Sequence, residues 1–103
     1  MSQRPFQQLS AAWDAIVRAA NRRSKLTYGD LAGEIGGIAR GMGALLGPIQ
    51  SHCEREGLPL LTALVVRASD GEPGPGFGSH RNAHQEQARV WAYAWNNVRN
   101  PFL

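Results

Sequence analysis

Apolar side chains recur at three- and four-residue steps through the first part of the chain, which is typical of one face of an amphipathic helix. The residues at this spacing are Phe6, Leu9, Trp13, Ile16, Val17 and Ala20. Basic residues gather at the C-terminal end of the same helix, at Arg18, Arg22, Arg23 and Lys25. They either complement the helix dipole or form a patch that contacts phosphates, and the sequence leaves both interpretations open.

The next segment predicts a short second helix that ends in a glycine turn. Thr27 can cap its first turn, and Asp30, three residues later, completes a capping box. Gly36 and Gly37 are expected to end the helix. The residues expected on its inner face are Leu31, Ala32 and Ile35. A short helix, a glycine turn and a further helix follow one another in a helix-turn-helix.

A third helix is expected to begin near Ile38 or Ala39 and to end at Glu56, with Gly57 as its C-terminal cap. Pro48 inside it predicts either a kink or a restart of the helix. Its apolar face is formed by Met42, Leu45, Leu46 and Ile49.

This third helix is unusually rich in glycine, at Gly41, Gly43 and Gly47. Each glycine inside a helix costs roughly 1 kcal/mol relative to alanine. Their density therefore indicates that another helix or a ligand approaches the backbone closely.

The run Leu60–Val66 is the clearest candidate for a strand, and its nearly continuous apolar character predicts that both faces are covered. Ser69–Glu72 predicts a turn, and Pro73–Phe77 is typical of an extended, rigid wing. Because a single strand needs a partner, we expect a minimal sheet of two or three strands.

A last helix is expected from about Arg81 to Asn97, with Ser79 as its cap. Trp91 and Trp95 on its apolar face favour packing against the first helix and Trp13 over base stacking. The other members of that face are Ala83, Gln87, Val90, Ala94 and Val98.

These elements predict an α+β, mainly α fold: a helix-turn-helix or winged-helix-like domain with a minimal sheet and a C-terminal helix packed on the N-terminal helix. The 103 residues suit one domain, 1–103. No run of about 18 apolar residues is present, so no membrane partner is expected. Met1–Phe6 lacks an apolar signal core, which favours a cytoplasmic protein.

The net charge of +3 comes from 11 basic and 8 acidic residues, and Lys25 is the single lysine. Arginine suits bidentate contacts with phosphates, so the balance permits a nucleic-acid partner without requiring one. Cys53 is the single cysteine and is expected to be a buried structural thiol. His80 and His84 are interpreted as a fortuitous surface pair, with a small nuclease as a remote alternative, and no metal or cofactor is expected.

Three stretches in order resemble the C-terminal DNA-binding domain of alkylguanine-DNA alkyltransferases and the alkyltransferase-like proteins. They are Ser24–Ala32, Ala39–Gly47 and Ser69–Phe77. The resemblance covers about half of the chain, roughly from Lys25 to Phe77.

The resemblance implies that Ala39–Gly47 is a recognition helix in the minor groove. It further implies that Tyr28 lies near the DNA backbone and that Arg40 enters the duplex in place of an extruded base. The resulting candidate DNA-binding residues are Arg22, Arg23, Lys25, Thr27, Tyr28, Ala39, Arg40, Gly41 and Gly43.

The chain departs from this family where the family has its reactive Pro-Cys-His-Arg motif. Counting back from Ser69–Gly71, the corresponding residues are Thr62–Val65, so Ala63 stands in place of the nucleophilic cysteine and Leu64 in place of the histidine. Alkyl transfer needs both a thiolate and an activating base. We therefore expect no catalytic residues and no enzymatic activity.

Two functions from different classes remain. The first is a small non-enzymatic protein that binds double-stranded DNA through this helix-turn-helix and wing. The second is a protein-interaction module, such as an adaptor, immunity or inhibitor protein, built on the same scaffold. Basic residues that converge on one face would favour DNA, and an exposed apolar patch would favour a protein partner.

Overall fold

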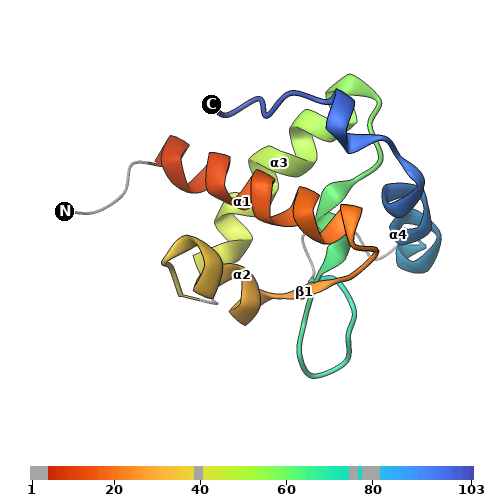
Figure 1. Ribbon diagram of the computed structural model, residues 1–103. Coiled ribbons are helices and arrows are strands. Elements are labelled where there is room, and N and C mark those ends of the chain that lie inside the picture. The colour runs from red at the N-terminus through yellow and green to blue at the C-terminus, as the bar shows by residue number, and fades with distance from the viewer. Residues whose placement is uncertain (1–4, 39–40, 75–76, 78–81) are drawn as a thin grey trace.

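The computed structural model describes residues 5–38, 41–74, 77 and 82–103. Helix α1 (Pro5–Asn21) lies across the middle of the molecule, where it packs on α2 (Tyr28–Ile35) and α3 (Met42–Glu56) (Figure 1). Leu9, Trp13 and Ile16 are buried along its inner face, as the helical spacing predicted. Within the described ranges, no helix is both long and apolar enough to cross a membrane.

Helix α2 begins and ends as its sequence predicts. The Thr27 hydroxyl accepts a hydrogen bond from the Asp30 N–H (3.0 Å), and the Asp30 carboxylate accepts one from the Thr27 N–H (3.1 Å). This is a complete capping box. Gly36 ends the helix in the left-handed conformation, with φ of 78°.

Helix α3 begins at Met42, later than the expected start near Ile38 or Ala39, and Ala39 lies outside the described residues. The helix runs through Pro48 without a break, so a restart at that residue is wrong. Pro48 cannot donate to the carbonyl of Ala44, but Ala44 is exposed, where water can satisfy it. Gly57 ends the helix with φ of 68°, as predicted.

The predicted strand Leu60–Val66 is mostly wrong. Leu61–Leu64 form the 3-10 helix η2, and Val65–Val66 are the whole of strand β2, which pairs in parallel with β1 (Leu26–Thr27). The register places Leu26 opposite Val65 and Thr27 opposite Val66. The expectation that both faces are covered is confirmed, because every residue from 60 to 66 is buried.

Side chains from helix α4 (Ala83–Ala92) form the hydrogen bonds to this buried backbone that a neighbouring strand would otherwise form. The Glu86 carboxylate accepts from the Leu60 N–H (2.8 Å), and the Gln87 amide donates to the Ala63 carbonyl (2.9 Å). Buried backbone groups must be paired, and these side chains do so without a ladder. The continuous apolar pattern of Leu60–Val66 is therefore compatible with a 3-10 helix as well as with a strand.

Helix α4 is shorter than the predicted span from Arg81 to Asn97. Asn82 caps it by accepting from the Gln85 N–H (3.0 Å), and the proposed cap Ser79 lies outside the described residues. The helix ends at Ala92 and is followed by the 3-10 helix η4 (Trp95–Asn97). The Trp95 indole turns back and donates to the Val90 carbonyl (2.7 Å) in the last turn of α4.

The predicted packing of α4 on α1 is confirmed, but of the two tryptophans expected to meet Trp13 only Trp95 makes a ring contact with it in the described chain, and the Trp91 indole donates to Ser24 instead. The Trp13 and Trp95 rings meet edge to face, with centroids 6.0 Å apart. Asn100 donates to the Ser10 carbonyl (3.0 Å), which fixes the end of the chain on α1. Cys53 is buried in the core, and burial raises the pKa of its thiol, as expected of a structural cysteine. The coarse prediction of a mainly helical α+β fold with a minimal sheet is thus confirmed.

Candidate nucleic-acid interface

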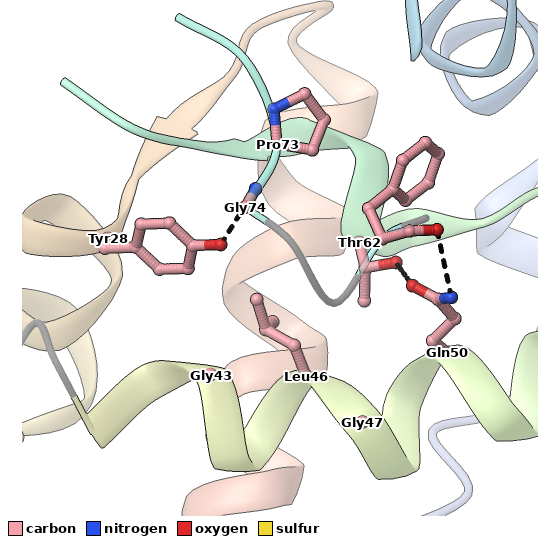
Figure 2. Close-up of a pocket in the computed structure, with 9 residues that line it drawn as sticks. Tyr28, Gly43, Leu46, Gly47, Gln50, Thr62, Pro73 and Gly74 are labelled. Atoms are coloured by element: carbon pink, nitrogen blue, oxygen red, sulfur yellow. Dashed lines mark hydrogen bonds between the residues drawn. The ribbon is translucent and has the colours of Figure 1, made fainter. Parts of the chain in front are cut away.

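A pocket of about 150 Å³ opens between α2, α3 and the segment that follows β2 (Figure 2). Of the lining residues that the structure describes, Tyr28 alone has an ionisable side chain. The lining residues are Tyr28, Gly43, Leu46, Gly47, Gln50, Thr62, Pro73, Gly74 and Phe77. Among these described residues, Tyr28 and Phe77 contribute aromatic rings, and Gln50 and Thr62 contribute polar groups.

Two glycines leave the backbone of α3 bare where it borders this pocket. A Cβ built at Gly43 or at Gly47 meets no other atom of the described chain within 4 Å, and both residues are exposed. The described protein itself does not use the close approach that these glycines allow. Their conformational cost in a helix is thus not offset by internal packing.

Tyr28, the first residue of α2, is hydrogen-bonded to Gly74 on the opposite side of the pocket. Its hydroxyl accepts a hydrogen bond from the Gly74 N–H (3.1 Å). A Cβ at Gly74 would overlap that hydroxyl, so any other residue at this position would displace the end of the Tyr28 side chain. An antiparallel bridge between Val66 and Pro73 aligns the preceding residues. The turn predicted at Ser69–Glu72 is present, with Gly71 at φ of 70°.

The polar end of the pocket is formed by Gln50 and Thr62. The Thr62 hydroxyl donates to the Gln50 side-chain oxygen (2.7 Å), and the Gln50 amide donates to the Phe77 carbonyl (3.5 Å). Both side chains are thereby held in fixed orientations at the rim of α3 and the start of η2 (Figure 2). Ala63 and Leu64, the positions that the sequence resemblance assigns to a cysteine and a histidine, are fully buried and do not line the pocket.

The basic cluster predicted at the end of α1 divides into two groups. Arg18 pairs with Glu34 (2.6 Å) and is therefore engaged within the fold. Arg22, Arg23 and Lys25 are exposed, and no ion pair links them to any acidic side chain in the described part of the chain. These three residues, with Ser24 between them, are called the basic segment below.

The basic segment contains the one described non-glycine residue with positive φ, Arg23, at 55°. The Ser24 N–H donates to Ala19 (2.9 Å) and the Arg23 N–H to Ala20 (3.1 Å), which is the Schellman arrangement that usually has glycine at this place. The left-handed conformation costs an L-residue roughly 1–2 kcal/mol. Residues held in such conformations cluster at functional sites.

Three acidic side chains on α2 and in the turn after β2 have partners within the fold. Asp30 serves the capping box, and Asp70 pairs with Arg67 (2.7 Å). The Glu72 N–H, followed by the Arg67 side chain, holds the pKa of Asp70 below its usual value. Glu72 lies 3.3 Å from the His84 imidazole.

The basic segment and the pocket are close along the chain. Lys25 and Tyr28 are three residues apart, and three extended residues span at most about 11 Å. The two-residue strand β1 connects them directly. Lys25 therefore lies at most about 11 Å from Tyr28 at the wall of the pocket.

Not every predicted site residue takes a place at this interface. Tyr28 and Gly43 line the pocket, Gly41 is exposed just before α3, and the Thr27 side chain is occupied by helix capping. Ala39 and Arg40 lie outside the described residues, as does His80. The described ranges contain no group of three or more His, Cys, Asp and Glu side chains that could hold a metal ion.

Sequence reasoning did not identify Gln50, Thr62 and Gly74 as site residues. The run of proline and glycine at 73–76 indicated a rigid segment but not its partner, and Gln50 has no local signal at all. No family model, no curated protein and no solved structure matches this chain.

The contact between Tyr28 and Gly74 predicts a coupled pair of substitutions. Gly74→Ala should lower the free energy of unfolding by about 1–3 kcal/mol, because its methyl group displaces the Tyr28 hydroxyl. In a Tyr28→Phe background the same change should cost less, since the overlapping atom is gone. Urea denaturation of the wild type, both single variants and the double variant measures this coupling. If the two substitutions change the free energy of unfolding additively, the Gly74 Cβ position and the Tyr28 hydroxyl are not in contact.

Proposed function

We propose that the protein is a non-enzymatic, double-stranded DNA-binding protein that uses α2 and α3 as a helix-turn-helix and Pro73–Phe77 as a wing. The observation that carries the proposal is the bare glycine face of α3 beside the pocket. A minor groove about 6 Å wide admits a helix only where side chains are very short. Gly43 and Gly47 meet that requirement, and the resemblance to the alkyltransferase DNA-binding domain agrees with it.

Arg22, Arg23 and Lys25 would contact phosphates on the DNA backbone. They are exposed, adjacent and free of ion pairs among the described residues, whereas Arg18 is held by Glu34. Arginine and lysine contacts of this kind position DNA without reading its sequence. Arg40 stays the candidate for insertion into the duplex, and Arg40→Ala is expected to weaken binding.

The pocket would receive one unstacked base. Its volume, about 150 Å³, equals that of an engineered cavity of about 150 Å³ that accommodates benzene, so a pyrimidine ring fits. Extruded bases are bound by stacking on aromatic or apolar side chains and by hydrogen bonds to their polar edges. Tyr28 and Phe77 can supply the first kind of contact, and Thr62 and Gln50 the second. With Ala63 buried at the family's cysteine position, the bound base would stay unmodified.

The proposal predicts that one substitution stabilises the fold and weakens DNA binding. Arg23→Gly should raise the free energy of unfolding by up to about 1 kcal/mol, because glycine relieves the left-handed strain. The same change should reduce the magnitude of the salt slope of duplex binding by about 0.9, the value of one phosphate contact. Fluorescence anisotropy at several salt concentrations and urea denaturation measure the two effects. Arg55→Gln, which removes one charge in the last turn of α3, is the charge control: it should leave the salt slope unchanged, and its loss of a cation at the helix C-terminus should lower the free energy of unfolding by up to about 1 kcal/mol rather than raise it.

A second prediction concerns the pocket. Gly47→Leu should fill it from α3 and abolish the rise in fluorescence that an unstacked pyrrolocytosine shows when wild-type protein binds a mismatched duplex. The helix should tolerate the change, because nothing lies within 4 Å of the Gly47 Cβ position. Gly33→Leu is a matched control, since Gly33 is an equally uncrowded glycine on α2 that does not line the pocket. An unchanged fluorescence rise in Gly47→Leu would contradict base entry.

One observation favours the alternative of a protein-interaction module. Ile38 is 63% exposed at the edge of an apolar groove between α1 and the start of α3, lined also by Leu9, Met42, Leu45 and Pro48. An exposed apolar patch of this kind suits a protein partner. If this alternative holds, Ile38→Ser abolishes capture of the partner, and the wild type shows no salt-sensitive binding to duplex DNA.

A further inference from the structure

Helix α4 reaches the basic segment although it contributes nothing to the pocket. The Trp91 indole N–H donates to the Ser24 carbonyl (3.1 Å), across 67 residues of sequence. The Asn21 side chain likewise bonds to Asn96 (3.4 Å) just before the same segment. Figure 1 shows the connection between α1 and β1 beside α4. These contacts link the C-terminal part of the chain to the candidate phosphate-binding residues.

The basic segment needs such support. Its local hydrogen bonds all return to the last turns of α1, and Arg23 is held in a disfavoured conformation. A bond to the Ser24 carbonyl fixes the peptide unit that joins Ser24 to Lys25. The backbone between Arg23 and Lys25 is therefore held on one side by α1 and on the other by a group outside α1.

Resting on the proposed DNA-binding function, we propose that Trp91 is a positioning residue that holds Arg23 and Lys25 in the arrangement that contacts DNA phosphates. The partner of this surface is the sugar-phosphate backbone that flanks the site under α3. Trp91 is half-buried and lies beside the cations, so bound DNA shields its ring. Trp13 and Trp95 are buried in the core and lie away from this contact.

The chain offers a matched pair of variants for the test. Trp91→Phe and Trp95→Phe each keep an aromatic ring and each remove one indole hydrogen bond to a backbone carbonyl, of Ser24 and of Val90 respectively. Trp91→Phe should weaken duplex binding by about three- to tenfold, which one hydrogen bond can account for, and should reduce the magnitude of its salt slope. Trp95→Phe should lower the urea midpoint of unfolding more than Trp91→Phe does. In the absence of urea it should leave the affinity for duplex DNA and its salt slope unchanged.

Acrylamide quenching of tryptophan fluorescence supplies a second readout, which does not depend on a change in the stability of any variant. In wild-type protein the accessible tryptophan emission comes from Trp91, so saturating duplex should reduce the quenching constant, and Trp91→Phe should lack this change. If wild-type protein binds duplex but Trp91→Phe keeps its affinity and salt slope and quenching is unaltered, the positioning role is overturned and the proposed function stands. If wild-type protein binds no duplex, the proposed function fails, and the role of Trp91 fails with it.

Discussion

The buried backbone N–H and C=O groups of Leu60–Val66 need hydrogen-bond partners, and a sheet supplies few of them. The arrangement of the surrounding elements depends on how these groups are paired. Only Val65 and Val66 have a strand beside them in the described chain, and η2 turns part of the run on itself. Glu86 and Gln87 supply hydrogen bonds at Leu60 and Ala63. Because an unpaired buried group costs about 1–3 kcal/mol, α4 must lie where these two side chains reach.

The candidate interface is a consequence of that arrangement. With η2 fixed in the core, Thr62 faces α3 and meets Gln50 at the end of the pocket. The short pairing of β1 with β2 brings Tyr28 opposite Gly74, while α4 lies close enough for Trp91 to reach Ser24. Core packing thereby places the open glycines of α3 and a ring-sized pocket beside Tyr28, which follows the basic segment after the two residues of β1.

Local signals predicted the helices well, and tertiary contacts decided what could not be predicted. The capping box at Thr27 and the glycine ends at Gly36 and Gly57 are short-range effects, and they were found in the sequence. The strand at Leu60–Val66 was wrong because full burial gives the same apolar pattern for a strand and for a 3-10 turn. At the site, glycine density indicated a close approach to α3, but the engagement of Arg18 by Glu34 and the pairing of Gln50 with Thr62 depend on residues brought together by folding.

The central claim is that this face binds DNA through phosphate contacts made by the basic segment. The most direct test is the affinity of wild-type protein for a short duplex over a series of salt concentrations. Three neutralised phosphates, at about 0.9 each, predict that log Kd rises with log salt with a slope of about 2.7 or more. Duplex binding that does not change with salt, or no binding even at low salt, would contradict the claim.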